Sequence, residues 1–176
     1  MSPGEAGAAM VLVRENFAPQ SRIKIRAFGS SNDANHLTGP SRDGSGLAQA
    51  IRTALDSVKL SPAEIDFIHA HGTGTSFNDA MESLALKTIF GEVCPPVSGA
   101  KGMLGHTLGA AGVIETICCV LAMENNFLPG TPRLGLPAEG SPKNLLREPR
   151  PAAKLKKCFE VEHRFRRHER RADFEP

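Results

Sequence analysis

Hydrophobic residues along this chain follow two alternating patterns. Apolar residues that recur every three to four positions predict three helices, which cover residues 46–58, the stretch from Asn78 or Asp79 to Phe90, and residues 109–123. The third stretch is nearly all apolar, so we expect it to be buried on most sides. Short runs of apolar and β-branched residues lie between the helical stretches and predict strands. They cover residues 8–14, 22–28, 65–70 and 96–99, and residues 127–134 form a further extended segment.

Turn residues separate these stretches. Ser61-Pro62-Ala63-Glu64 supplies a capping serine, a first-turn proline and a box glutamate, so it predicts a short helical turn. Gly91 is placed to end the second helix, and residues 30–46 form a polar loop. The alternation of strands and helices indicates an α/β layer architecture with a mixed or largely parallel sheet and helices on its faces.

Composition narrows the class of protein. The 176 residues are 40% hydrophobic and 23% charged, and we see no apolar run long enough to span a bilayer. With no Trp or Tyr and a net charge of +2, the chain lacks the usual means of binding nucleic acid. The N-terminus lacks the pattern of a secretory signal. Because its four cysteines show no metal-ligand spacing, we expect no metal and a reduced, cytoplasmic protein.

The most specific chemistry lies in two histidine motifs. HGTGT runs from His71 to Thr75, and SGAKGMLGHTLGAAG covers residues 98–112. Each motif places an imidazole among glycines and hydroxyls where a strand leads into a helix, and Lys101 comes five positions before His106. Glycine lets the backbone approach a ligand closely. Two imidazoles and an ammonium with small neighbours suit a site that admits a long thin substrate and stabilises an oxyanion.

In this order and spacing, the motifs resemble the C-terminal half of a β-ketoacyl-acyl carrier protein synthase, a condensing enzyme with the thiolase-like fold. The resemblance covers about residues 4–151. Its other parts are GEAGAAMVLV near the start, Asn78, Asp79 and Glu82 after the first motif, SSNDANHLTGP at residues 30–40, and LPGTPRL at residues 128–134.

The resemblance implies roles for four residues of the reaction centre. His71 and His106 match the two active-site histidines, whose Nε2–H groups stabilise the enolate oxyanion as malonyl-carrier protein loses carbon dioxide. Lys101 matches the active-site lysine, and Glu115 matches the carboxylate that pairs with it. A lysine in this place also keeps nearby imidazoles neutral by like-charge repulsion.

Thr73 and Thr75 match the hydroxyls that hold the phosphopantetheine arm of the substrate. The arm belongs to the acyl carrier protein, so the resemblance implies no separate cofactor. His69 reads as a structural residue and His36 as a solvent-facing one.

Other residues of the motifs have simpler explanations. Asp79 and Glu82 are explained as well by helix capping and the helix dipole as by function. Glu115 stands on an apolar helix, and a buried carboxylate normally has a partner.

The resemblance also indicates what the sequence lacks. Condensing enzymes are roughly twice as long, and their nucleophilic cysteine lies in a first half that has no counterpart here. None of the four cysteines replaces it (Cys94, Cys118, Cys119 and Cys158). We therefore interpret residues 1–16 as the last strand of the missing half, 17–151 as the synthase C-terminal domain and 152–176 as a basic, disordered or aberrant tail.

The end of the chain departs from the family pattern. The family closes with N-x-G-F-G-G-T-N and an apolar strand, whereas residues 158–176 contain no glycine. Back-translation of this segment, read one nucleotide later, permits the lost motif. We therefore hypothesise a single-nucleotide shift near Lys157, which would leave an unpaired strand edge and exposed apolar surface. The alternative is a disordered basic tail that binds an acidic partner.

Three functions follow from this resemblance. The first is an acyltransferase fragment that serves decarboxylative Claisen condensation in fatty acid or polyketide synthesis and is inactive alone for lack of the cysteine. The second is a non-catalytic subunit that binds an acyl carrier protein or another synthase. The third, a full thiolase, is the weakest of the three interpretations. The expected partners are an acyl carrier protein and a missing half or dimer partner, with no nucleic acid and no membrane.

Overall fold

The structure, a computed structural model, describes all residues except 1, 19, 21–22, 33–39, 138 and 163–176. The helices are α1 (Ser45–Ser57), α2 (Ser76–Phe90), α3 (Lys101–Leu104) and α4 (Ala111–Asn125), with single 3-10 turns at Glu15–Phe17, Pro62–Glu64 and Leu108–Ala110. The strands are β1 (Phe67–His69), β2 (Val97–Ser98), β3 (Phe127–Leu128), β4 (Arg150–Pro151) and β5 (Cys158–Glu160).

Three of the strands form a parallel sheet in the order β2-β1-β5. Ile68 in the central strand lies opposite Val97 on one side and Phe159 on the other. β3 and β4 form a separate antiparallel pair. The predicted α/β architecture is confirmed, and its main sheet is parallel.

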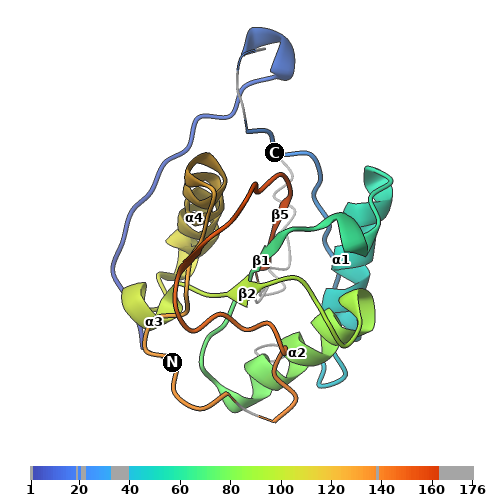
Figure 1. Ribbon diagram of the computed structural model, residues 1–176, viewed down its shortest axis with the longest axis vertical. Coiled ribbons are helices and arrows are strands. Elements are labelled where there is room, and N and C mark those ends of the chain that lie inside the picture. The colour runs from blue at the N-terminus through green and yellow to red at the C-terminus, as the bar shows by residue number, and fades with distance from the viewer. Residues whose placement is uncertain (1, 19, 21–22, 33–39, 138, 163–176) are drawn as a thin grey trace, which may run out of the picture.

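The side chains of β1 alternate between the two faces of this sheet, as strand geometry requires. Ile68 packs in a core cluster with α1 and α2, which contribute Ile51 and Leu86 among others. Phe67 belongs to a second cluster on the opposite face, where α4 contributes Cys119. Figure 1 shows the resulting layers, with α4 on one side of β1 and α1 and α2 on the other. The two core clusters therefore pack against opposite faces of β1, and together they fix the position at which the chain leaves that strand.

The predicted helices agree with the structure in position, and the Ser61 turn agrees in detail. Ala63 N–H donates to the Ser61 hydroxyl at 3.3 Å, and Ser61 N–H donates to Glu64 at 3.0 Å. The second helix begins at Ser76, before the predicted caps, and Asn78 is buried inside it. Gly91 ends that helix with a φ of 80°.

The burial of α4 differs from the prediction. Its buried positions form a single stripe (Ala111, Glu115, Cys119 and Ala122), and Leu121 on another side is 52% exposed. The helical stretch Leu108–Asn125, with a mean hydropathy of 1.4, is also long and apolar enough to cross a membrane by length and composition, so our expectation of no such run is wrong. One such stretch is weak evidence of a span. The buried ion pair of Glu115 with Lys101 fits a helix of a protein core instead.

The two strands predicted near the N-terminus are absent from the described residues. Residues 8–14 and the described part of 22–28 have no strand structure, and Val11 is 88% and Phe28 81% exposed. In Figure 1 the blue segment runs outside the layers as an extended arm. A strand needs a neighbouring strand for its backbone groups, and none of the described strands lies in or pairs with these two ranges. The nearest bridge is that of Pro3, which precedes them, to His106.

The part of the interpretation that makes residues 152–176 disordered is wrong for residues 152–162, while the aberrant reading frame stays a hypothesis. β5 pairs with β1, and Leu155 and Val161 are buried in the two cores. Asp66 N–H donates to the Lys157 carbonyl and Val161 N–H to the His69 carbonyl. This segment thus supplies an outer strand of the main sheet, and residues 163–176 lie outside the described part.

Candidate active site

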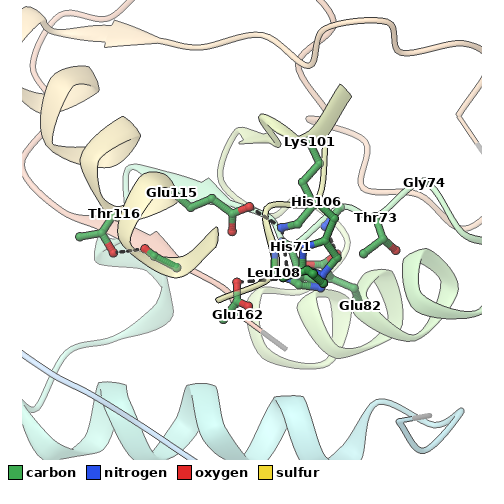
Figure 2. A network of polar contacts seen from close by, with 12 residues as sticks. His71, Thr73, Gly74, Glu82, Lys101, His106, Leu108, Glu115, Thr116 and Glu162 are labelled. Carbon is green, nitrogen blue, oxygen red and sulfur yellow. Dashed lines mark hydrogen bonds and ion pairs between the residues drawn. The ribbon is translucent and has the colours of Figure 1, made fainter. Parts of the chain in front are cut away.

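The candidate site lies where the three parallel strands end. His71 follows β1 by two residues, Lys101 follows β2 by three, and Glu162 follows β5 by two. The carboxyl ends of parallel strands meet at one edge of a sheet, which is where open α/β sheets bind ligands. Figure 2 shows these side chains converging, with Glu115 and His106 beside them.

Buried Glu82 holds the turn that carries His71. Its carboxylate accepts hydrogen bonds from His71 N–H at 2.7 Å and from Gly72 N–H at 2.9 Å. Glu82 lies beyond the first turn of α2, so it acts neither as a cap nor through the helix dipole. Burial raises the pKa of Glu82, and the two backbone hydrogen bonds oppose that rise. Glu82 is therefore a positioning residue for the first histidine motif.

Lys101 is the buried cation at the centre of the site. Its Nζ lies 3.2 Å from His71 Nδ1 and forms a close ion pair with Glu115 Oε1. Burial raises the pKa of Glu115 to about 7 although Lys101 pulls it down. The other oxygen of Glu115 is buried without a hydrogen-bond partner among the described residues. Lys101 and Glu115 are therefore paired, in a buried place that disfavours the charged form of the Glu115 carboxyl.

His106 approaches His71 from the loop after α3. The two rings meet edge to face, with centroids 5.3 Å apart and planes at 85°. Leu108 N–H donates to His106 Nδ1 at 3.2 Å, so the neutral ring carries its proton on Nε2. Burial, Lys101 and His71 lower the pKa of His106. His106 is thus a neutral imidazole with an Nε2–H donor.

Backbone contacts fix the His106 loop against the start of the chain. His106 N–H donates to the Ser2 carbonyl at 2.8 Å, and Gly4 N–H donates to the His106 carbonyl at 3.0 Å. Gly105 has a φ of +72°, and a Cβ there would lie 2.8 Å from the Pro3 carbonyl oxygen. A side chain at position 105 would therefore displace the strand-like contact that orients His106.

Glu162 is a site residue that sequence reasoning missed. Its Oε2 lies 3.4 Å from His71 Nδ1. Burial pushes the pKa of Glu162 up, but the contact with His71 and the charges of His71, Lys101 and His106 outweigh burial and lower the pKa overall. No family motif signals this residue, because it lies where the sequence departs from the family pattern.

Three donor atoms in this cluster have the spacing of a metal site. One ligand atom from each of His71, Glu115 and Glu162 lies within 4.8 Å of the others. The Lys101 ammonium is already in contact with Glu115 and near His71. It supplies the positive charge that a bound cation would bring, and a second cation there would be repelled. Lys101 therefore competes with a metal ion for these ligand atoms.

The two threonines of the first motif contact each other. Their hydroxyl oxygens are 2.9 Å apart, and Thr73 also donates to Asp79 at 3.5 Å. Asp79 accepts from Gly74 N–H at 3.2 Å, which closes the loop before α2. A cleft of about 720 Å³ is lined by Thr73 and Lys101 but not by Thr75, His71 or His106. Thr73 is therefore the threonine that the cleft reaches.

His69 is fully buried beside the site. Burial and the charge of Lys101 lower its pKa to about 4, so it is neutral at physiological pH. It packs edge to face with Phe67 on the same side of β1. These contacts fit the structural role expected for it, while His36 lies outside the described residues.

The four cysteines are all free, and none has the environment of a nucleophile. Burial raises the pKa of each thiol, that of Cys158 to about 12. A nucleophilic cysteine requires the opposite shift, toward the thiolate. None of the four cysteines is therefore an activated thiol.

Comparison with known proteins agrees with this geometry. Residues 23–134 match the family described as β-ketoacyl synthase, C-terminal domain. The granaticin polyketide putative β-ketoacyl synthase 1 of Streptomyces violaceoruber is 41% identical over 138 residues, which cover 74% of this chain and 33% of that protein. The 3-oxoacyl-[acyl-carrier-protein] synthase 2 of Coxiella burnetii is 39% identical over 141 residues, covering 76% and 34%. The chain thus spans about one third of the length of these relatives.

Solved structures show the same relationship. The ishigamide ketosynthase/chain length factor has a TM-score of 0.67 at 40% identity, over 73% of this chain and 33% of that one. A type II polyketide synthase acyl-carrier protein in complex with its ketosynthase bound to the hexaketide has a TM-score of 0.72 at 30% identity, over 77% and 34%. The predicted fold, the C-terminal half of a thiolase-like α/β fold, is confirmed.

Proposed function

Since this chain belongs to the β-ketoacyl synthase family through its C-terminal domain, we propose that it supplies the oxyanion side of a decarboxylative Claisen condensation. The substrates are malonyl-carrier protein and an acyl thioester, as in fatty acid or polyketide synthesis. The observation that carries the proposal is the edge-to-face pair of His71 and His106, 5.3 Å between centroids, with Lys101 Nζ 3.2 Å from His71 Nδ1.

The chemistry runs through the thioester carbonyl of the malonyl group. When the bond to the carboxylate breaks, carbon dioxide leaves and the electron pair passes to the α carbon and the carbonyl oxygen. His106 Nε2–H donates to that oxygen, and its lowered pKa keeps the ring neutral for this role. His71 donates in the same way when its Nδ1 accepts from Lys101 and its proton is on Nε2. The carbanion then attacks the acyl thioester, and the thiolate leaves.

The phosphopantetheine arm would approach along the loop of the first motif. The Thr73 and Thr75 hydroxyls are within 2.9 Å of each other, and Thr73 lines the 720 Å³ cleft. Hydroxyls can both donate to and accept from the amides of such an arm. One solved relative is a ketosynthase in complex with its acyl-carrier protein, which supports an acyl carrier protein as partner here. Binding through this arm calls for no further cofactor.

The test supplies malonyl-carrier protein and an acyl thioester to this chain, with and without a separately expressed nucleophile-bearing half of a relative. We expect carbon dioxide release by the chain, and carbon–carbon bond formation only in the mixture. Condensation by the chain alone, or no carbon dioxide release in either sample, would contradict the proposal.

A second candidate function is that of a partner subunit that binds a carrier protein or another synthase. Two observations favour it: all four thiols have raised pKa values, and one solved relative is a ketosynthase in complex with its chain length factor. A pull-down with carrier protein, comparing the wild type with Thr73→Ala, separates the partner function from the catalytic one. If the wild type binds carrier protein but releases no carbon dioxide, the result supports the partner role. A cytoplasmic location, with no nucleic acid or membrane partner, stays a prediction.

A further inference from the structure

We propose that Glu162 holds His71 in the tautomer with its proton on Nδ1 and thereby restrains His71 as an oxyanion donor. The statement about the tautomer stands on the contacts and charges around the ring, and its catalytic consequence rests on the proposed function. Glu162 lies in the segment after β5 that has no counterpart in the family motif, so the family does not assign it a role.

Two groups of opposite character approach the same ring atom. Lys101 Nζ lies 3.2 Å from His71 Nδ1 with hydrogen-bond geometry, and Glu162 Oε2 lies 3.4 Å from the same atom as an ion-pair contact without that geometry. An ammonium can only donate, so Lys101 needs a bare Nδ1; an ionised carboxylate can only accept, so Glu162 needs Nδ1–H. A neutral ring has one proton and cannot satisfy both groups. Figure 2 shows Glu162 and Lys101 on either side of His71.

The surrounding charges favour Glu162 in this competition. Lys101 keeps its close ion pair with Glu115 whichever tautomer His71 adopts. Among the described residues His71 is the ion-pair partner of Glu162, and the lowered pKa of Glu162 keeps it ionised. If Nδ1 were bare, it would lie 3.4 Å from a carboxylate oxygen that has no hydrogen-bond partner among the described residues, in a buried place where repulsion is poorly screened. In the Nδ1–H tautomer Lys101 no longer donates to His71, but the repulsion between Nδ1 and the Glu162 carboxylate is removed.

The consequence concerns Nε2, the atom that the proposed mechanism uses. In the Nδ1–H tautomer Nε2 carries a lone pair and cannot donate to an oxyanion. His106 has the opposite arrangement, because Leu108 N–H occupies its Nδ1 and leaves the proton on Nε2. The chain as it stands thus has one oriented donor and one that Glu162 restrains.

The experiment reads the tautomer directly. The full chain is labelled with ¹⁵N-histidine, and long-range ¹H–¹⁵N correlation spectra assign the protonated nitrogen of His71. We expect Nδ1–H in the wild type and Nε2–H in Glu162→Gln, because the amide can donate to Nδ1 where the carboxylate could only accept. Glu124→Gln, an exposed change on α4, is the control and should leave His71 unchanged.

Two further arms keep the proposal testable if Glu162→Gln folds poorly. The wild-type spectrum alone decides the resting state, and Nε2–H there would overturn the proposal. Lys101→Met removes the competing donor, so we expect the Nδ1–H tautomer to persist in it. A His71 spectrum that does not differ between the wild type and a folded Glu162→Gln would also overturn the proposal.

The catalytic arm measures carbon dioxide release from malonyl-carrier protein. A single oxyanion donor is worth roughly 10²–10³-fold in rate, so we expect Glu162→Gln to be at least about 10-fold faster than the wild type. A slower or equal rate in a variant that has switched tautomer would overturn the restraining role. Absence of release in every sample would contradict the proposed function instead, because the spectra test the tautomer independently.

Discussion

At the residue scale, the site consists of charged groups that compensate one another inside the protein. Lys101 and Glu115 have side chains that are 5% and 3% exposed, and each is the other's close partner. His71 and Lys101 were predictable because each follows an apolar strand within a recognisable motif. Glu162 was not, because its contact with His71 depends on the pairing of a strand that the sequence signals only weakly.

The buried pair makes a prediction for stability. Lys101→Met leaves the Glu115 carboxyl buried without its partner, so we expect a loss of about 3–5 kcal/mol in the free energy of unfolding. The double variant Lys101→Met/Glu115→Leu removes both charges and should recover most of that loss. Urea unfolding of the two variants measures the difference. Equal destabilisation by the single and double variants would show that the lysine acts through packing and not through charge.

Glu115 also makes a prediction for pH dependence. Its pKa is about 7 in the folded chain and 4.5 ordinarily, so between these values the unfolded chain releases a proton that the folded chain keeps. The contribution of Glu115 to stability is therefore fully present below pH 4.5 and is lost as the pH rises to about 7. We expect the free energy of unfolding, measured relative to Glu115→Gln, to fall across this window and to level off above it. A difference that rises with pH would contradict the assignment.

At the element scale, the parallel sheet brings the site together. His71, Lys101 and Glu162 come from the ends of β1, β2 and β5, which are neighbours in the sheet although β5 is the last strand of the described residues. The sequence pattern located the helices and the strands β1 and β2 because their apolar residues are internally regular. It did not locate β5, whose three residues are only partly buried. Short strands depend on partners far away in the sequence, and a local pattern does not report them.

β5 is expected to contribute to stability through Val161. This side chain is 2% exposed in the core beneath α1 and α2, so Val161→Ala should lower the free energy of unfolding by roughly 1–3 kcal/mol. Val11→Ala is the matched control, since Val11 is 88% exposed, and it should change stability by less than about 0.5 kcal/mol. Chemical unfolding compares them, and equal effects would mean that the segment 158–162 is not docked in solution.

At the scale of the whole molecule, the chain presents apolar surface that its own layers do not cover. The exposed side chains of the N-terminal arm include Val11, Leu12, Val13, Phe17, Ile25 and Phe28. Runs of β-branched and apolar residues such as these are typical of strands. The two strands are absent because the described part of the chain offers them no neighbouring strand.

This surface predicts self-association. Large exposed apolar patches promote contacts between copies. We expect the triple variant Val11→Ser/Leu12→Ser/Val13→Ser to stay monomeric to higher concentration than the wild type, with an unchanged free energy of unfolding. Light scattering over a concentration series measures the effect. If the variant associates as readily as the wild type, a different surface is responsible for the association.

The most direct test of the central claim is the rate of carbon dioxide release from malonyl-carrier protein by the chain and its His106→Ala variant. His36→Ala, which changes a histidine outside both motifs, serves as the control. The account predicts a loss of roughly 10²–10³-fold in His106→Ala and none in the control, because His106 supplies the oriented Nε2–H donor. An undiminished rate in His106→Ala would contradict it.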